Sequence, residues 1–473
     1  MNWKRTKIVA TISDKKAEPE FIRKLYKAGM DVVRINTAHQ EIEGTMRLME
    51  NVRKVSDKIA FILDTKGPEI RTTVSEGTLN FSKGEHVNII GDPESRTNNS
   101  VIAVTYSDFA SDVPVGSHIL IDDGILELEV LSKDGQVLEC EVLNDAPLGS
   151  RKSVNVPKVK LCLPSISEKD KRYIDFAIEN DIDFIAHSFV RSAQDVQDVQ
   201  KILDEKNSKI KFIAKIENQE GVDNLNEILE NSYGIMVARG DLAIEIPYER
   251  IPGIQRRIIN KCIKKRKPVI VATQMLHSMI KNPRPTRAEV SDIANAIYWQ
   301  TDAIMLSGET AYGKYPVESV ETMTRVAKEV EKNKEKFLEL PAGSLTGEVS
   351  AYLAKVAVKT ASRVGAKYII SDTVRGRTIR NMAAYRGYNP IIAQCYSDRT
   401  MRELALSYGV YPSLQEKHKS SEKFLKIALE NLLKSHELKD NDILVVLAGN
   451  FNRGAGSSYI EVGSVEFLKD RVS

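Results

Sequence analysis

The chain has 473 residues, of which 42% are apolar and 28% are charged, and its net charge is +3. This composition is typical of a soluble globular protein of two or three domains, and the small net charge excludes a bulk attraction to nucleic acid or to a membrane surface. No apolar run approaches a membrane-spanning length, and the first residues have no signal-peptide core. The four cysteines lack the spacing of a metal site, so we expect reduced thiols in a cytoplasmic protein.

Eight short apolar segments alternate with segments of helical spacing in two parts of the chain. The segments predicted to be β-strands are 7–13, 32–36, 59–64, 184–190, 211–217, 234–238, 268–273 and 303–306. Helices are predicted between them, for example at 19–29, 41–56, 168–180, 250–265 and 286–299. Nearly continuous apolar strands are typically buried on both faces. The two parts, 1–71 and 158–340, together have the ~250 residues of a (β/α)8 TIM barrel, which is the fold we predict for them.

Polar residues gather where the predicted strands end. In a (β/α)8 barrel the functional groups lie at the C-terminal ends of the strands. These ends carry Arg34, Asn36, Asp64, His187, Ser188, Lys215, Glu217, Arg239, Asp241, Thr273, Ser307 and Glu309. Residues with a purely structural role would be spread over both ends of the barrel, so their concentration at one rim favours a functional site.

The segment Lys215-Ile216-Glu217 lies at the centre of this rim. Alternate residues of a strand point the same way, so Lys215 and Glu217 should project together. The next strand ends in Arg239-Gly240-Asp241 and brings a second carboxylate. A lysine with two carboxylates suits a divalent cation and a phosphoryl group in transfer. For a lone lysine and glutamate at this spacing, the alternative is a weak surface ion pair.

Residues 72–157 interrupt the barrel pattern after its third strand. Segments 119–121 and 125–130 flank an Asp-Asp-Gly turn and predict a hairpin, and 137–142 also alternates. Pro68 and Pro157 flank the insertion. A compact β-barrel domain attached at the rim is expected to act as a lid that excludes water. The alternative is an insertion that has no part in the function.

The barrel pattern ends near residue 340, and 341–344 is predicted to be a linker. A helix at 349–365 and strands at 368–370, 391–393 and 443–447 predict a C-terminal α/β domain at 341–473. The segment Thr373-Val374-Arg375-Gly376-Arg377-Thr378 precedes a helix, where backbone amides, hydroxyls and arginines suit an anion. The glycine-rich segment 449–458 is expected to close over it. We predict a phosphate-type effector site here; an ordinary helix cap is the alternative.

Several motifs, in order along nearly the whole chain, resemble the pyruvate kinase family. They are DTKGPEIR at 64–71, IAKIENQEG at 213–221, MVARGDL at 236–242, ATQM at 272–275, PTRAEVSD at 285–292 and MLSGETA at 305–311. The resemblance implies a Mg²⁺-dependent phosphotransferase of glycolysis that converts phosphoenolpyruvate and ADP into pyruvate and ATP. It also implies allosteric control by a sugar phosphate or nucleotide and a homotetramer.

The resemblance also implies a role for individual residues. Glu217 and Asp241 would bind Mg²⁺, with Mn²⁺ as an alternative metal. Lys215, Arg34 and Thr273 would be catalytic, and they would bind phosphoenolpyruvate together with Gly240 and Asp241. The nucleotide would contact Asn36, His39, Arg71 and Lys152. Potassium would bind Asn36, Asp64 and Thr65, and the effector would bind Thr373, Arg375, Gly376, Arg377 and Thr378.

The chain departs from the family pattern at four positions. Ala38 stands where the family usually has serine and offers no hydroxyl to potassium, although Glu69, the carboxylate that accompanies potassium dependence, is present. We therefore expect a weakened or water-completed potassium site. Ala243 and His277 replace the usual glycine and glutamate and are interpreted as packing changes. Arg375 replaces a small hydroxyl residue, which leaves the identity of the effector open.

Two other functions compete with this interpretation. One is a different magnesium-dependent barrel enzyme acting on an enol or oxoacid, such as an aldolase; the lid and the Arg71 and Lys152 pair favour a nucleotide instead. The other is an inactive protein that senses sugar phosphates; the presence of Lys215, Glu217 and Asp241 argues against it.

Overall fold

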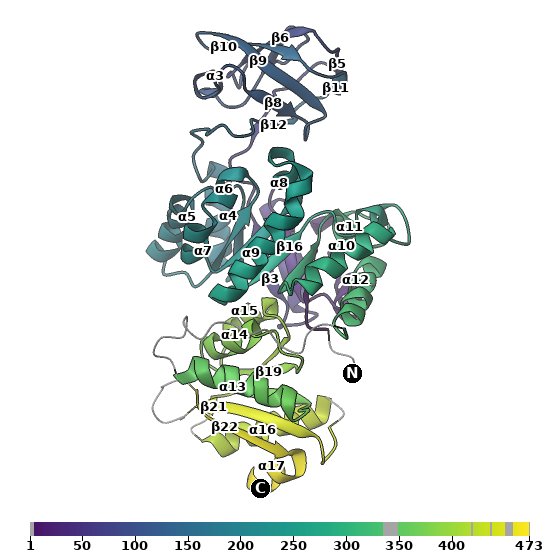
Figure 1. The fold of residues 1–473 in the computed structure, drawn as a ribbon, viewed down its shortest axis with the longest axis vertical. Helices are drawn as coiled ribbons and strands as arrows, with labels where there is room; N and C mark the ends of the chain where they lie inside the picture. The colour runs from purple at the N-terminus through teal and green to yellow at the C-terminus, as the bar shows by residue number, and fades with distance from the viewer. Residues whose placement is uncertain (1–3, 334–348, 418–419, 436–437, 450–456, 473) are drawn as a thin grey trace.

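The computed structural model describes residues 4–333, 349–417, 420–435, 438–449 and 457–472. Figure 1 shows three parts stacked along the longest axis, with a small β domain at one end, the barrel in the middle and an α/β domain at the other end. The predicted linker at 341–344, and residues 450–456 of the predicted closing segment, lie outside the described residues. Within the described part of the chain, no helix is long and apolar enough to cross a membrane.

The central part is a closed barrel of parallel strands, as predicted. The strand order is β1-β17-β16-β15-β14-β13-β3-β2, which returns to β1. The bounds are β1 Lys7–Thr11, β2 Val32–Asn36, β3 Ala60–Asp64, β13 Phe184–His187, β14 Lys211–Ile216, β15 Gly234–Ala238, β16 Val269–Ala272 and β17 Ala303–Leu306. Because all neighbours are parallel, the eight C-terminal ends meet at one rim.

Several predicted strands are too long by one to three residues. Ser13, Val190, Glu217 and Thr273 lie beyond the last paired residue of their strands. Apolar or β-branched residues such as Ile12, Val190 and Thr273 extended the pattern, but backbone pairing ends where the chain turns outward at the rim. The turn at Thr273 is one example, because both Thr273 and Gln274 have left-handed backbones with φ of 67° and 54°.

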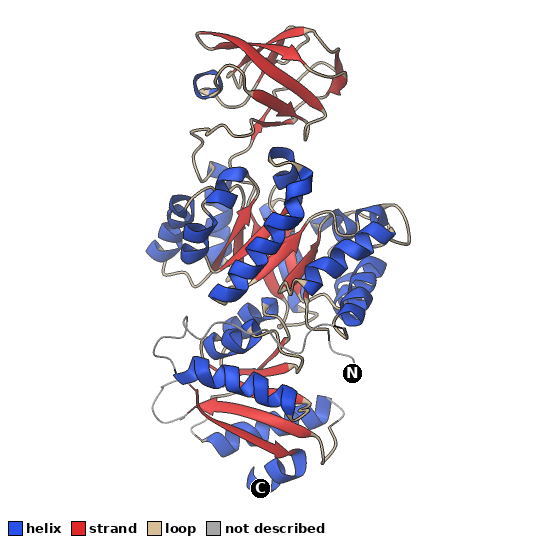
Figure 2. Ribbon diagram, viewed as in Figure 1, coloured by secondary structure: helices blue, strands red, loops and turns tan. Residues whose placement is uncertain are grey.

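Helices surround the barrel, as Figure 2 shows. Several begin at side-chain caps: Ser167 and Thr286 form capping boxes at the starts of α4 and α10, and Ser192 caps α5. Outer bounds are α1 Pro19–Ala28, α2 Ile42–Arg53, α4 Glu168–Glu179, α5 Ala193–Glu205, α6 Gln219–Asp223, α7 Leu225–Asn231, α8 Arg239–Glu245, α9 Ile251–Lys265, α10 Arg287–Tyr298, α11 Gly308–Ala311 and α12 Pro316–Val330, with 3₁₀ turns η1 Asp14–Lys16, η2 Tyr248–Arg250 and η3 His277–Ile280.

The lid is an independent β domain with its own apolar core. Its main sheet has the order β4-β12-β8-β9-β10-β6-β7, and an isolated bridge between Thr72 and Val104 joins its two edges, so the sheet curls into a small barrel. The sheet includes Ile70 and Arg71, so its strands begin two residues before the predicted boundary. Bounds are β4 Ile70–Arg71, β5 Leu79–Phe81, β6 His86–Ile90, β7 Val101–Ala103, α3 Phe109–Asp112, β8 His118–Ile121, β9 Leu126–Asp134, β10 Val137–Val142, β11 Ala146–Leu148 and β12 Ser153–Asn155.

The C-terminal domain contains a five-stranded sheet of order β20-β19-β18-β21-β22. The sequence pattern did not predict two of its strands, β20 and β22. Strand β20 contains proline and serine and lies at one edge of the sheet, and β22 pairs antiparallel at the other edge. Neither has the apolar run of a central strand. Bounds are α13 Val349–Arg363, β18 Tyr368–Thr373, α14 Arg377–Ala384, β19 Ile391–Cys395, α15 Asp398–Glu403, η5 Leu404–Leu406, β20 Val410–Leu414, α16 Ser421–Ser435, β21 Ile443–Gly449, β22 Ser457–Ser464 and α17 Val465–Val472.

The C-terminal domain closes the N-terminal end of the barrel. Ala405 and Leu406 of η5 belong to the same buried cluster as inward-facing strand residues such as Val9 and Ile62. The lid and the C-terminal domain therefore lie at opposite ends of the barrel (Figure 1). Among the described residues, the C-terminal domain covers the N-terminal end of the barrel, and the C-terminal rim faces the inserted β domain (Figure 1).

Candidate active site

Lys215 lies at the centre of the rim. It is the fifth residue of β14, and it is buried. Its ammonium donates to Asp64 Oδ1 at 2.9 Å and to Ser188 Oγ at 2.6 Å, and it lies 3.0 Å from Glu217 Oε1. The predicted meeting of Lys215 and Glu217 is thus confirmed. The alternative of a surface ion pair is excluded because all three charged groups are almost completely buried.

Asp64 joins Lys215 to Arg34. The Arg34 Nε donates to Asp64 Oδ2 at 2.6 Å, and its Nη1 donates to Thr11 Oγ1 at 3.0 Å. Burial alone would raise the pKa of Asp64, but the charges of Arg34 and Lys215 outweigh burial, and the pKa of this carboxyl is lowered. Asp64 therefore stays ionised and fixes two cations side by side on β2 and β14.

In Glu217 the effect of burial on the carboxyl pKa outweighs the effect of the nearby cation, which is the opposite of Asp64. Burial raises the pKa of its carboxyl to about 8; the carboxylates of Asp241 and Asp64 add to this effect, while Lys215 opposes it. The Phe189 amide donates to Glu217 Oε2 at 2.6 Å. Burial would lower the pKa of Lys215, but Asp64 and Glu217 raise it, so the lysine stays charged. Three carboxyl groups, Asp64, Glu217 and Asp241, thus lie near two cations, and a further bound cation would favour the ionised form of Glu217.

Gly240, Asp241 and Thr273 form the neighbouring part of the rim. Arg239 and Asp241 directly follow the end of β15 at Ala238, as expected, and they lie in the first turn of α8. The Gly240 amide donates to Thr273 Oγ1 at 2.8 Å. The structure therefore brings the predicted carboxylate-binding amide into direct contact with the predicted catalytic threonine.

Arg239 holds this part of the rim from behind. Its guanidinium donates to the carbonyls of Ala272 at 3.2 Å and Thr273 at 2.5 Å, and it pairs with Asp292 at 2.5 Å. A left-handed backbone is unusual for a β-branched residue such as threonine and costs ~1–3 kcal/mol. We conclude that Arg239 supports the strained turn that presents Thr273. The sequence placed Arg239 at the rim but gave no sign of this role.

Two rim residues have structural roles that the sequence did not distinguish from catalytic ones. His187 Nε2 lies 2.8 Å from the Ser165 carbonyl and Nδ1 lies 2.8 Å from Thr65 Oγ1, and burial lowers its pKa, so it is a neutral, satisfied histidine. Glu309 accepts the backbone amides of Leu276 and Ser307 at 3.0 and 2.8 Å. Both residues fix rim loops rather than facing a substrate.

The predicted potassium ligands lie together. Asn36 and Asp64 are register partners on β2 and β3, and Thr65 follows directly. The Asn36 Oδ1 accepts the Ala38 amide at 3.1 Å. These oxygens form a compact group next to Arg34, although both Asp64 oxygens already accept from cations.

The predicted nucleotide contacts are divided between the barrel and the lid. Asn36 and the exposed His39 lie at the end of β2, whereas Arg71 lies on β4 of the lid and Lys152 directly precedes β12, which pairs with β4. Arg71 pairs with Glu69 at 2.6 Å, and Lys152 pairs with Asp122 at 2.8 Å. In this structure the two lid cations are thus paired with carboxylates close to them in the lid and its hinge.

The predicted effector segment adopts the expected turn before α14. The Gly376 amide donates to Thr373 Oγ1 at 2.8 Å, and Gly376 has a left-handed backbone with φ of 73°. Arg375 and Arg377 are exposed, and Thr378 lies in the first turn of α14. An effector stays a prediction here.

Among the described residues, no group of three or more His, Cys, Asp or Glu side chains is arranged to hold a metal ion. Glu217 and Asp241 nevertheless fit a hard dication that takes its remaining ligands from a substrate and water. Their oxygens are the donors that Mg²⁺ prefers, and because burial raises the pKa of Glu217 even beside Lys215, a bound dication would stabilise its ionised form.

Comparison with known proteins agrees with the resemblance of the motifs. Residues 3–320 match the family model for "Pyruvate kinase, barrel domain", and 352–461 match "Pyruvate kinase, alpha/beta domain". A pyruvate kinase of Borreliella burgdorferi is 49% identical over 98% of both chains. One from Staphylococcus epidermidis is 42% identical over 94% of this chain and 78% of its own. A solved pyruvate kinase structure from Cryptosporidium parvum superposes with a TM-score of 0.90 at 36% identity, covering 98% of this chain and 96% of the other.

Proposed function

The chain belongs to the pyruvate kinase family and transfers the phosphoryl group of phosphoenolpyruvate to ADP, and from this premise we propose a role for each group at the rim. The observation that carries the proposal is the buried contact of the Lys215 ammonium with Asp64 and Glu217. This contact holds a compact cation beside carboxylates at the open end of the barrel.

Lys215 and Arg34 bind the phosphoryl group. A phosphoryl transition state needs positioning and positive charge more than covalent help. Asp64 holds both cations in place before the substrate arrives, which avoids reorganisation during the reaction. Lys215 is the compact charge that follows the group from the enol oxygen to the β-phosphate of ADP.

The turn at Thr273 binds the substrate carboxylate. In the proposed complex, the amides of Gly240 and Asp241 and the hydroxyl of Thr273 all donate to the substrate carboxylate. Without substrate, the Thr273 hydroxyl accepts a hydrogen bond from the Gly240 amide. Loss of the phosphoryl group leaves an enolate, and its carbon takes a proton to give pyruvate. We assign to Thr273 the role of positioning a water that delivers that proton.

Glu217 and Asp241 hold Mg²⁺, with Mn²⁺ as an alternative. When bound, the metal offsets charge on the phosphoryl and carboxylate oxygens of the substrate. The excess of carboxylates over cations at this rim supports the assignment. The amide of Phe189 keeps one Glu217 oxygen oriented.

The nucleotide binds between rim and lid. Asn36 and His39 contact it from the barrel, and Arg71 and Lys152 reach it from the lid. Arg71 lies on β4, and Lys152 directly precedes the neighbouring strand β12, so one rotation of the lid moves them together. Closure then exchanges their partners Glu69 and Asp122 for phosphate oxygens and excludes water.

Potassium binds at Asn36, Asp64 and Thr65 but weakly, because Ala38 offers no hydroxyl. Activity should rise with KCl, with half-saturation at a higher concentration than in an Ala38→Ser variant. Full activity in potassium-free sodium or Tris buffer would rule this site out.

The effector segment, Thr373 with Arg375, Gly376, Arg377 and Thr378, binds an anion such as a sugar phosphate or nucleotide. The turn at Gly376 and the exposed arginines support this role. A cytoplasmic homotetramer is proposed from family membership.

A coupled assay with phosphoenolpyruvate, ADP and Mg²⁺ tests the function. Pyruvate and ATP should form in equal amounts. Cleavage of an oxoacid without any need for ADP would favour the aldolase-type reaction, and no turnover would favour the inactive sensor.

A further inference from the structure

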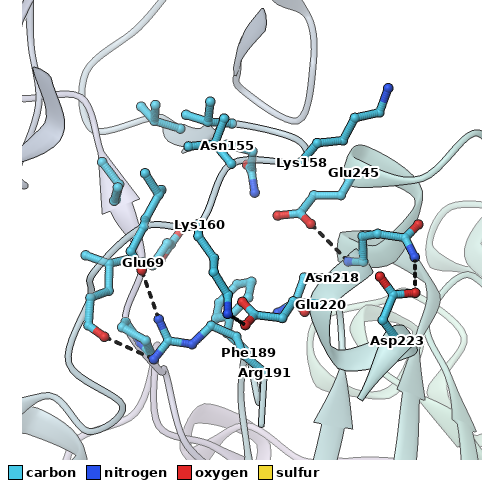
Figure 3. A pocket seen from close by; sticks show the side chains of 18 residues that line it. Glu69, Asn155, Lys158, Lys160, Phe189, Arg191, Asn218, Glu220, Asp223 and Glu245 are labelled. Atoms are coloured by element: carbon cyan, nitrogen blue, oxygen red, sulfur yellow. Dashed lines mark hydrogen bonds and ion pairs between the residues drawn. The ribbon is translucent and has the colours of Figure 1, made fainter. Parts of the chain in front are cut away.

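A cavity of about 340 Å³ lies behind the active site, at the hinge of the lid. Its walls come from both chain crossings between barrel and lid, at 68–70 and 154–163, and from barrel loops at 189–191 and 218–223 (Figure 3). None of the residues assigned above to the substrate, metal, potassium, nucleotide or effector lines it. The cavity is thus separate from the site of phosphoryl transfer, although Phe189 and Asn218 stand between the two.

Part of the cavity lining is apolar. Ile70, Val156, Val159, Leu161 and Phe189 contribute to this part, and polar and charged side chains form the rest. A cavity of this size that combines apolar side chains with polar groups is typical of small-molecule sites. An aliphatic or aromatic group that entered the cavity would remove apolar surface of both the ligand and the protein from water, which favours binding.

Most charges that line the cavity already have partners. Lys160 pairs with Glu220 at 2.7 Å. Arg191 donates to the carbonyls of Leu161 at 3.2 Å and Leu163 at 3.0 Å, and it pairs with Asp195. These contacts attach the strap at 158–163 to the barrel, so the cavity has a fixed frame on both sides.

Glu245 differs from these groups. Its Oε2 accepts the Gln219 amide at 3.2 Å, and no basic side chain among the described residues forms an ion pair with it. Burial raises the pKa of its carboxyl, and the charge of Glu220 adds to this rise. In Figure 3 its carboxylate points into the cavity, while the Lys158 side chain extends away from it. Glu245 is only partly exposed, and a partly desolvated carboxylate without a cation is an arrangement that a cationic ligand would stabilise.

We propose that this hinge cavity binds a small organic amine, whose ammonium group pairs with Glu245 and whose apolar body packs against Phe189, Leu161 and Val159. The nearby Phe189 ring also suits a cation. Such a ligand contacts both crossings of the lid and the barrel at once. It therefore occupies the place where the lid must pivot.

Binding can be measured directly on the full-length chain by ligand-observed NMR titration at pH 8, with 2-phenylethylamine as the probe and 2-phenylethanol as its uncharged isostere. The amine should bind at least about tenfold more tightly than the alcohol, the difference expected of one charge-assisted contact. Equal affinity of the two, or no binding of the amine, would overturn the proposal. Because no turnover is measured, this result is independent of the kinase assignment.

Variants identify the partner of the amine. Glu245→Gln should weaken amine binding about tenfold and leave the alcohol unchanged, since only the ion pair is lost. Glu245→Lys should reverse the preference, so that 3-phenylpropanoate binds and the amine does not. Glu249→Gln, an exposed residue outside the cavity, is the matched control and should bind the amine normally. A reversed preference requires a folded cavity, so it separates a binding role of Glu245 from a structural one; an unchanged preference in Glu245→Lys contradicts the proposal.

Discussion

Buried charges lie at both ends of the barrel, but they are paired differently. At the end closed by the C-terminal domain, Asp302 accepts both terminal nitrogens of Arg386 at 2.8 and 2.6 Å, and Asp183 accepts Arg402 at 2.7 Å. These aspartates directly precede β17 and β13. At the open rim, the carboxyl groups of Asp64, Glu217 and Asp241 lie near two basic side chains of the described residues, Lys215 and Arg34. One end is neutralised by the protein itself, and the other is left for a ligand to neutralise.

This comparison corrects one argument from the sequence. The sequence pattern favours a site at one rim because polar residues concentrate there, whereas residues with structural roles would be spread over both ends. The structure shows that both ends have buried polar groups, and that the useful criterion is whether each charge has a partner. A buried ion pair with complete hydrogen bonds is a structural unit, whereas an excess of carboxylates indicates a site for a cation.

The largest expected effect is on the rim. Lys215→Met should lower kcat by at least about 10³-fold with modest change in KM for phosphoenolpyruvate, because its charge acts mainly in the transition state. Lys211→Met is the matched control at the other end of the same strand, where Lys211 lies 3.8 Å from Glu403. Steady-state kinetics should show nearly normal turnover for that control. Normal turnover of Lys215→Met would show that the assignment is wrong.

The next effect is on stability and concerns the closed end. Arg386→Met leaves Asp302 buried without its cation and should lower the free energy of unfolding by ~3–5 kcal/mol, with little change in activity per folded molecule. Denaturant titration measures this loss. Adding Asp302→Asn should recover part of it. A double variant less stable than Arg386→Met would contradict the pairing argument.

A smaller effect is expected behind Thr273. Arg239→Lys keeps a charge near Asp292 but loses the fork that holds the Ala272 and Thr273 carbonyls. We expect kcat/KM for phosphoenolpyruvate to fall about 10–100-fold, the usual cost of losing a supporting contact. The melting temperature should change little. If kcat/KM stays normal, the turn does not depend on Arg239.

The smallest effect is a pH dependence at the closed end. Burial lowers the pKa of Lys7 to about 8, although Asp31 opposes the shift. Between that value and the ~10.4 of an unfolded lysine, the unfolded chain binds more protons, so stability should rise with pH. The free energy of unfolding relative to Lys7→Met should therefore increase by about 1–2 kcal/mol across this window. A difference that does not vary with pH would show that Lys7 is not desolvated.

Much of the site was accessible from the sequence because its residues follow strands. Lys215 and Glu217 are two residues apart, and the period of a strand aligns them. Asp64 and Arg34 lie 30 residues apart, but parallel pairing of β2 and β3 brings them together. The role of Phe189 was not predicted from the sequence. Its backbone amide, held in a left-handed turn, donates to Glu217, and the type of its side chain does not indicate such a contact.

The fold was predicted most accurately where strands are buried on both faces. The edge strands β20 and β22 were missed because one of their sides lacks a neighbour, so their sequences are mixed. His187 and Glu309 have the residue types of catalytic groups, and only their saturated hydrogen bonds identify them as structural. The hinge cavity was also inaccessible, since it forms between segments far apart in the chain.

The amino-acid sequence by itself determined the parallel barrel, the inserted β domain and which polar residues lie close to the strand ends, because these depend on local periodicity and on motifs. Only the tertiary structure decided which of those charges are neutralised. Pairing in a buried site depends on distances between residues up to hundreds of positions apart, such as Lys215 with Asp64 at the rim and Arg402 with Asp183 at the closed end. Electrostatic energy depends on those distances and on burial, and neither is encoded in spacing along the chain.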